Sequence, residues 1–151
     1  MAPDAAAFAA VRRLLPQAWQ AVLRPRLQWY GCRGAFFHHD AHFGRVLFGA
    51  WCLAGPERRL LYPRLRIGLP ASPGDAAIFD PFEPHGVLDP GESTWQRERY
   101  AGAEPSLFLG FELEITPALA AAFGIGELAP AAVLLSSRVA VNAETGALRP
   151  T

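Results

Sequence analysis

Lysine is absent from this chain of 151 residues, and all 14 of its basic residues are arginine. This absence excludes any mechanism that needs a lysine Schiff base or a lysine general base. The 14 acidic residues balance the basic ones, so the formal net charge at pH 7 is zero. A chain without net charge has no general electrostatic attraction to nucleic acids or anionic membranes. We therefore expect neither nucleic acid nor a membrane as a partner.

Cysteine is scarce, and long apolar runs are missing. Cys32 and Cys52 are the two cysteines of the chain, and they are too far apart in sequence to form a short zinc-ligand pair. We predict that both are small apolar side chains in the core of a protein from a reducing compartment. No apolar run approaches about 18 residues, and the N-terminus lacks the basic-then-apolar order of a signal peptide. These features predict a cytoplasmic protein.

Two common enzyme classes lack their motifs here. The chain contains no Gly-x-Ser-x-Gly sequence, which argues against a serine hydrolase with a nucleophile elbow. Neither of the two glycine-rich phosphate-binding patterns occurs, which argues against nucleotide binding.

Apolar residues recur at three- and four-residue steps from Asp4 to about Leu23. This periodicity predicts an amphipathic N-terminal helix that Asp4 caps, that bends or divides at Pro16 and that ends before Pro25. We expect its apolar face to pack on a sheet, and binding of a partner is the alternative use of that face.

The segment from Arg26 to Ile115 has the pattern of a mainly β protein. Glycine and proline interrupt it at short intervals, and aromatic and branched residues fill the gaps. This pattern predicts a barrel or sandwich of short strands. A short helix at 118–123 and a strand at 132–141 follow, so we expect one domain over 1–151, with an N-terminal helix (1–24), a β-barrel core (26–116) and a C-terminal helix and strand (117–151). The core strands are expected near 27–30, 35–41, 46–53, 60–69, 76–79, 85–88 and 107–115.

All four histidines fall in two clusters, with His38, His39 and His42 close together and His85 after a Pro-Gly-Asp turn. Alternate residues of a strand share a face, so His38 and Asp40 point the same way and His39 points the other way. His42 shares their face one pleat further on, about 7 Å from Asp40, as a neighbour of the site or a replacement ligand. If His85 arrives from an adjacent strand, the set of two histidines and one carboxylate suits Fe(II) with open coordination positions. The alternative is a polar surface strand with incidental histidines.

A family resemblance rests on these residues. His38-x-Asp40, followed at residues 74–87 by Gly-Asp-x-x-x-Phe-Asp-Pro-x-x-x-His-Gly-Val, resembles the core of the iron(II)/2-oxoglutarate-dependent dioxygenases over roughly residues 30 to 115. The resemblance implies a double-stranded β-helix, a jelly-roll or cupin-like barrel. It also implies that His38, Asp40 and His85 are the iron ligands of the catalytic centre and that Fe(II) and 2-oxoglutarate are the cofactors. The implied outcome is hydroxylation of a small molecule or of an amino-acid or short peptide side chain.

The same family pattern places an arginine ten or more positions after the distal histidine, where it holds the distal carboxylate of 2-oxoglutarate. Arg97 and Arg99 follow His85 at such a distance. A guanidinium group suits this role because it binds a carboxylate with two parallel hydrogen bonds. This chain departs from many relatives in that residues 100–105 separate the arginines from the last core strand. The alternatives are a solvent-exposed loop pair with no such role, or a carboxylate held by Arg64, Arg66 or Arg138.

Two other functions remain open at this stage. A cupin-type metal enzyme that does not use 2-oxoglutarate is the first, but cupins pair His-x-His with a following glutamate, and no glutamate occurs between Asp40 and Glu57. A non-catalytic β-sandwich that serves as a binding module is the second. Trp29, Tyr30 and Trp51 are aromatic candidates for the mouth of the barrel, although strand aromatics more often belong to the core.

Overall fold

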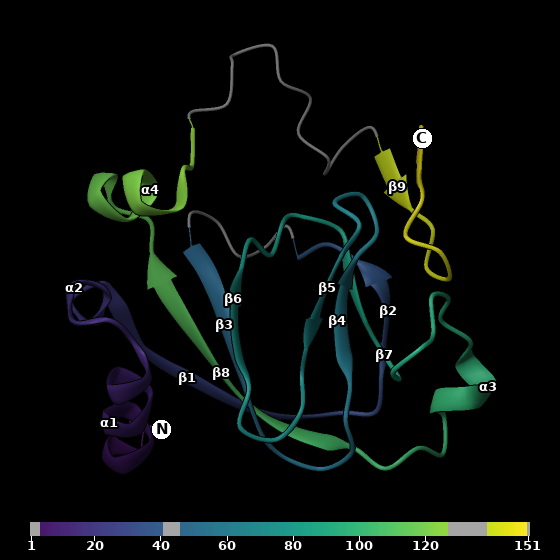
Figure 1. Ribbon diagram of the computed structural model, residues 1–151, viewed down its shortest axis with the longest axis horizontal. Helices are drawn as coiled ribbons and strands as arrows, with labels where there is room; N and C mark the ends of the chain where they lie inside the picture. The colour runs from purple at the N-terminus through teal and green to yellow at the C-terminus, as the bar shows by residue number, and fades with distance from the viewer. Residues whose placement is uncertain (1–3, 41–45, 127–138, 151) are drawn as a thin grey trace.

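The computed structural model describes residues 4–40, 46–126 and 139–150 (Figure 1). The described part of the chain is mainly β, as the sequence predicted, and its strands pair antiparallel. No helix within these residues combines the length and the apolarity that crossing a membrane requires. The helices are α1 (Ala5–Leu14), α2 (Gln17–Gln20), α3 (Arg97–Tyr100) and α4 (Pro117–Phe123). The strands are β1 (Leu23–Cys32), β2 (Ala35–His38), β3 (Val46–Ala54), β4 (Arg59–Tyr62), β5 (Ile67–Pro70), β6 (Ala76–Phe79), β7 (His85–Leu88), β8 (Ser106–Glu114), β9 (Val139–Val141) and β10 (Leu148–Pro150).

Two four-stranded sheets form the centre of the molecule, with strand orders β1-β8-β3-β6 and β2-β7-β4-β5. Of these eight strands, the first four pair with the last four in reverse order, β1 with β8, β2 with β7, β3 with β6 and β4 with β5. Strands β9 and β10 form a separate hairpin. The consequence for the site is that β2 and β7, far apart in sequence, lie side by side.

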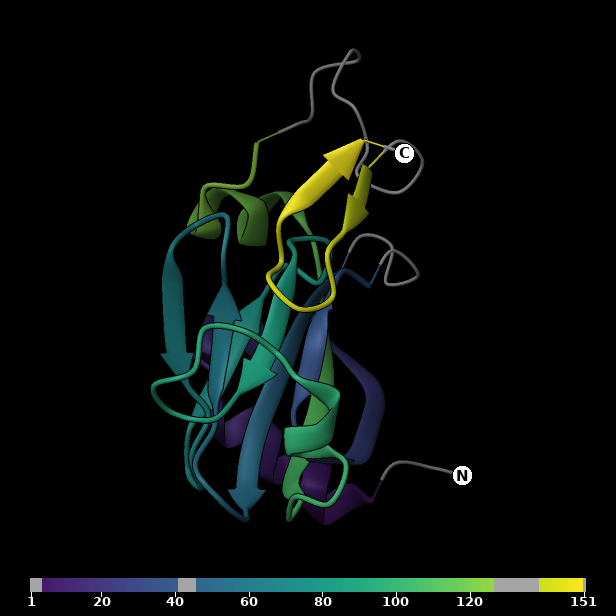
Figure 2. The same cartoon turned by 90° about the vertical axis from the view of Figure 1, so that its right-hand side faces the viewer.

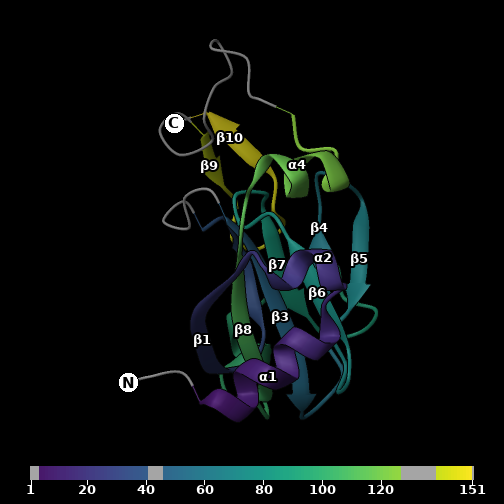
Figure 3. The ribbon, with the colours of Figure 1, turned by 90° about the vertical axis from the view of Figure 1, so that its left-hand side faces the viewer.

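The N-terminal helix behaves as its periodicity predicts. The Asp4 side chain caps it by accepting a hydrogen bond from the backbone nitrogen of Ala6 at 2.9 Å, and Pro16 separates α1 from α2. Ala7 and Val11 are buried in one apolar cluster with Leu109 and Phe111 of β8. Figure 3 shows α1 lying across the outer face of the sheet that contains β8. The helix therefore covers one outer sheet face, as predicted.

The predicted end of the N-terminal helix is wrong. The second helix ends at Gln20, and β1 begins at Leu23, so Pro25 lies inside a strand. β1 is at the edge of its sheet, and its register with β8 shifts between Leu23 and Leu27. Proline has no N–H to donate and is tolerated at such edges and bulges. Pro25 thus does not end a helix but lies at the register shift of an edge strand.

The single strand predicted at 60–69 is also wrong, because this segment forms the hairpin of β4 and β5. The backbone N–H of Arg66 donates to the carbonyl of Pro63 at 3.3 Å and closes the turn. Arg66 has a φ of 55°, which lies in the left-handed region. Glycine or asparagine usually marks that conformation in a sequence. Here an arginine adopts it, so the local signal of the turn is Pro63, a residue disfavoured inside a central strand.

A second apolar cluster covers the outer face of the other sheet. Phe37, Leu88 and Tyr100 are buried there, with Trp95 and Val141 packed against them. The C-terminal turn also hydrogen-bonds to this side, because the carbonyl of residue 143 accepts from the backbone nitrogen of Phe37 at 2.9 Å. Figure 2 shows the C-terminal hairpin and α3 on this side of the molecule. These contacts fix β2, the strand that ends in His38.

The C-terminal segments match the sequence in part. Helix α4 ends at Gly124, which has a φ of 65° as a left-handed cap, close to the predicted 118–123 helix. The chain turns at 142–146, where the Asn142 side-chain oxygen accepts from the backbone nitrogens of Glu144 and Thr145 at 3.0 Å. The predicted strand at 132–141 is described only in its last part, as β9, and 132–138 lie outside the described residues.

Close contact between β3 and β8 leads to a stability prediction. Gly49 pairs with Phe111, and a Cβ at Gly49 would meet the phenyl ring at 2.1 Å. The ring is 1% exposed and is packed in the apolar cluster under α1. We expect Gly49→Ala to lower the free energy of unfolding by about 1.5 kcal/mol through overpacking. Gly102→Ala is the control, because nothing lies within 4 Å of a Cβ there. Urea denaturation of both variants tests this, and equal stabilities would contradict it.

Candidate metal centre

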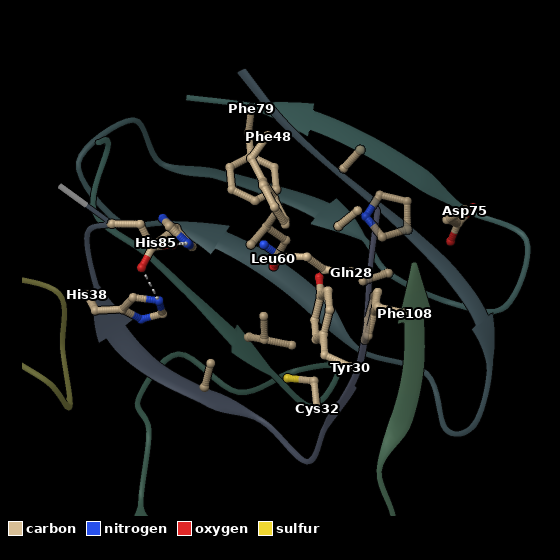
Figure 4. A pocket seen from close by; sticks show the side chains of 17 residues that line it. Gln28, Tyr30, Cys32, His38, Phe48, Leu60, Asp75, Phe79, His85 and Phe108 are labelled. Atoms are coloured by element: carbon tan, nitrogen blue, oxygen red, sulfur yellow. Dashed lines mark ion pairs between the residues drawn. The ribbon is translucent and has the colours of Figure 1, made fainter. Parts of the chain in front are cut away.

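Strand pairing brings the two histidine clusters together. His38 is the last residue of β2, His85 is the first residue of β7, and the two are partners across the strand pair. Side chains of residues directly opposite each other in an antiparallel pair lie on the same face of the sheet. The two imidazole rings accordingly have their centroids 4.7 Å apart, and Figure 4 shows them on the same side of a cavity.

Asp40 completes the group from the chain just after β2. Its backbone nitrogen donates to the carbonyl of Pro81 at 2.8 Å, which fixes it beside the turn that leads into β7. One carboxylate oxygen lies 3.5 Å from Nε2 of His38, and the other lies 3.6 Å from Nε2 of His85. The carboxylate therefore faces both rings at once.

Main-chain carbonyls set the orientation of both rings. Nδ1 of His38 lies 2.6 Å from the carbonyl oxygen of Phe36, and Nδ1 of His85 lies 2.8 Å from that of Glu83. A carbonyl oxygen only accepts, so each Nδ1 carries the proton and donates. In a neutral imidazole the other nitrogen, Nε2, then keeps its lone pair. Both lone pairs are directed toward the Asp40 carboxylate, and this arrangement is the one that metal-binding histidines use.

Burial favours the neutral form of His85. The residue is 4% exposed, and burial is the main cause that lowers its pKa, with His38 acting in the same direction. The Glu83 carbonyl and the nearby carboxylates of Asp40 and Asp80 oppose this change. Only a neutral imidazole can donate a lone pair to a metal ion, so the lowered pKa favours metal binding.

The three side chains have a donor set and spacing that suit a divalent metal ion. Their ligand atoms all lie within 4.8 Å of one another. Nitrogen and oxygen ligands bind such ions at about 2.0–2.2 Å, so two ligand atoms of one ion lie at most about 4.4 Å apart, and the three side chains would have to close in slightly around an ion. Two histidines and one carboxylate leave coordination positions open, which is typical of catalytic rather than structural sites.

The remaining histidines are not part of this group. His39 is not among the grouped ligand atoms, and its Nδ1 is buried without a hydrogen-bond partner among the residues that the structure describes. His42 lies outside the described residues.

A cavity of about 240 Å³ adjoins the three side chains and lies between the two sheets. Figure 4 shows His38 and His85 on one side of it and Asp75 with Phe108 on the opposite side. Most of the lining is apolar, and it includes Phe48, Phe79, Phe108, Leu60 and Val87.

Strand β1 adds further polar side chains to the cavity wall. Gln28, Tyr30 and Cys32 alternate along this strand and all face the cavity. The Tyr30 ring stacks on Phe108 with centroids 5.4 Å apart, and burial raises the pKa of its hydroxyl well above the usual value. Period-two spacing on β1 is the sequence signal that would have included Gln28 among the site residues.

Other side chains that the sequence suggested lie elsewhere. Trp29 is 54% exposed, and Trp51 packs with the apolar cluster under α1. Both cysteines are free, Cys52 is buried, and Cys32 is partly buried at the cavity. Burial raises the pKa of both thiols, which keeps them protonated and poorly reactive.

The structure does not bring Arg97 or Arg99 to the cavity. Both residues belong to the single-turn helix α3, and neither lines the cavity. Arg99 forms ion pairs with Asp89 at 3.0 Å and Glu92 at 2.7 Å. Arg97 is exposed. The segment of residues 95–105 thus lies on the outer face of the β2-containing sheet, and the interior strand β8 begins only at Ser106.

The other candidate arginines of the described chain do not line the cavity either. Arg64 is exposed and pairs with Glu83 at 2.9 Å, and Arg66 is exposed in the turn between β4 and β5. Arg138 lies outside the described residues. No arginine is therefore among the described residues that line the cavity, and this lining does not fit the distal carboxylate of 2-oxoglutarate.

Comparisons of the chain with protein-family models, with curated proteins and with solved structures find no match. The geometry of the site and the sequence motifs are accordingly the basis for a functional proposal.

Proposed function

We propose that this chain is a mononuclear non-haem metal enzyme, an oxygenase that holds Fe(II) between His38, Asp40 and His85. One observation carries the proposal. Two Nε2 lone pairs, each set by a main-chain carbonyl at Nδ1, and one carboxylate converge on the wall of an apolar cavity. Bound Fe(II) supplies the activation of dioxygen at its open coordination positions.

The strand order supports a jelly-roll barrel of the double-stranded β-helix type for this enzyme. In such a barrel the chain is doubled on itself and rolled up, so the first half of the strands pairs with the second half in reverse. The pairings β1–β8, β2–β7, β3–β6 and β4–β5 follow that scheme. The three proposed ligands, which we call the metal group, then lie at the end of β2 (His38), just after it (Asp40) and at the start of β7 (His85), as in the family that the motif resembles.

The residues around the metal group perform three tasks. His38, Asp40 and His85 bind the ion, and the Asp40 carboxylate balances part of its charge. Phe79 lies against the His85 ring with centroids 5.1 Å apart and restricts water on that side. The cavity holds a substrate against the metal, and its volume of about 240 Å³ supports hydroxylation of a small molecule or a single side chain.

The use of 2-oxoglutarate is the part of the proposal that the resemblance alone supports. The open coordination positions suit a 2-oxo acid, but the described cavity wall has no cation for the distal carboxylate. This observation favours a second candidate, a cupin-type metal enzyme that does not take 2-oxoglutarate. A binding module without catalytic function is the third candidate.

Anaerobic titration of 2-oxoglutarate into the Fe(II)-loaded chain distinguishes the candidates. A weak visible charge-transfer band is expected for the 2-oxoglutarate-dependent oxygenase and no band for the second candidate. The Asp40→Asn variant is the control, because it should bind neither the metal nor the co-substrate. If the wild-type chain binds no Fe(II) and no Co(II), both enzyme proposals are wrong.

A further inference from the structure

We propose that the cavity beside the metal group recognises an uncharged small molecule of about the size of one substituted ring, through a hydrogen bond to Tyr30 or Gln28. This inference deepens the proposed function by naming its substrate class. That the bound molecule is a substrate rests on the proposed function. Its binding in the cavity does not require the metal.

The size of the cavity sets the first limit. An apolar cavity of about 150 Å³ admits benzene. The present cavity, at about 240 Å³, has room for one ring with a small substituent. A second ring or a long chain would have to extend past the rim of the described cavity.

The charges of the cavity wall set the second limit. Asp40 at the metal group and Asp75 on the opposite side are its carboxylates, and no arginine is among the described lining residues. A buried anion without a partner is strongly disfavoured. A metal ion would supply positive charge only at the Asp40 side, so a second anionic group deep in the cavity would face Asp75. The described wall therefore selects against dicarboxylates and for uncharged ligands.

Two polar groups in the apolar wall define what the ligand must carry. The Tyr30 hydroxyl and the Gln28 amide both face the cavity (Figure 4). Neither forms a hydrogen bond with the described part of the protein. Asp75, which also lines the cavity, differs from them because its carboxylate accepts a hydrogen bond from the backbone nitrogen of Ser72 at 2.9 Å. Tyr30 and Gln28 are both partly exposed, so these groups are open to water, and a ligand that displaces this water has to replace its hydrogen bonds. A hydroxyl or carbonyl group of a ligand would satisfy them.

The packing around Tyr30 keeps its hydroxyl in place. Its ring stacks on Phe108, and a Cβ at Gly110 would approach the Tyr30 ring to 3.2 Å and the Phe48 ring to 2.7 Å. Because Gly110 has no side chain, the Tyr30 and Phe48 rings can pack directly against its backbone. High burial also raises the pKa of Tyr30, so the hydroxyl stays a donor over the physiological range.

Binding of 4-methylphenol and of toluene tests the inference, because the two probes share a ring and differ in one hydroxyl. Calorimetric titrations are done on the full chain with and without Co(II). We expect Tyr30→Phe to weaken 4-methylphenol binding about 3- to 10-fold, the range of one hydrogen bond, and to leave toluene binding unchanged. Ala50→Ile, which fills the cavity from β3, should weaken both probes about tenfold or more. Ala77→Val, its cross-strand partner on β6, replaces it if the larger substitution prevents folding.

The outcomes separate this inference from the proposed function. Failure of both probes to bind, tighter binding of 2-oxoglutarate than of 4-methylphenol to the metal-free chain, or equal effects of Tyr30→Phe on both probes would overturn the inference. A chain that binds 4-methylphenol as expected but no divalent metal would support the inference and disprove the proposed function. A chain that binds Co(II) but neither probe would disprove the inference and support the proposed function.

Discussion

Replacing Asp40 with asparagine is expected to weaken Co(II) binding by more than about 100-fold, because changes to groups that merely support metal ligands already cost 10- to 100-fold. Asparagine keeps the shape of the side chain but removes its charge. The two histidines alone would then hold a divalent cation beside a neutral amide. Calorimetric titration, or the visible absorption of bound Co(II), measures the affinity of both proteins.

The matched control for this experiment is Asp75→Asn. Asp75 lies in the same cavity, but its carboxylate accepts from Ser72 and is not part of the His38, Asp40 and His85 group. We expect this variant to bind Co(II) as the wild type does. Equal losses in the two variants would show that the ion responds to the general charge of the cavity, and no loss in Asp40→Asn would place the metal elsewhere.

Thermal unfolding gives a second readout of the same site. A ligand that binds only the folded state at 100 times its dissociation constant stabilises that state by about 2.7 kcal/mol. Excess Co(II) should therefore raise the unfolding temperature of the wild type and of Asp75→Asn. It should not raise that of Asp40→Asn, provided that the metal-free variants unfold alike.

The sequence predicted the three members of the candidate metal group, His38, Asp40 and His85, but the arrival of His85 from an adjacent strand was only a condition of that prediction. Strand alternation placed His38 and Asp40 on one face, and the family motif added His85. The pairing of β2 with β7 is a long-range contact, and no local pattern specifies it. The structure supplies that pairing, together with the two main-chain carbonyls that orient the rings.

The predicted role of Arg97 and Arg99 shows the limit of spacing along a chain. Their distance from His85 matches the family pattern, but distance does not say which face of a sheet the connecting chain follows. Here residues 95–105 cross the outer face, where Trp95 and Tyr100 pack on Phe37 and Leu88. Apolar burial of those aromatic rings decides the path, and the arginines follow it. A similar ambiguity affected Pro25, since a proline stops a helix and marks an irregular edge strand equally well.

Arg58 is a charged residue that sequence analysis did not single out and that the structure places in the interior. Its side chain is 5% exposed. One guanidinium nitrogen binds the Asp89 carboxylate, another donates to the carbonyl of Glu104 at 2.9 Å, and the group lies 5.9 Å from the centroid of the Tyr100 ring. The Tyr100 hydroxyl in turn accepts from the backbone nitrogen of Asp89 at 2.9 Å. Arg58 thus joins the start of β4, the end of β7 and the segment that leads into β8.

Arg58→Met is expected to lower the free energy of unfolding by about 3 kcal/mol, because removing one partner of a buried ion pair leaves the other partner uncompensated. The loss should lie at the low end of the usual range, since Asp89 is 23% exposed and keeps its pairing with Arg99. Arg59→Met is the matched control. That neighbouring arginine is exposed, and its one hydrogen bond within the described residues goes to the Gly68 carbonyl at 3.2 Å, so its replacement should change stability by less than about 0.5 kcal/mol. Urea denaturation at pH 7 measures both, and equal effects would show that the interior contacts of Arg58 contribute no net stability.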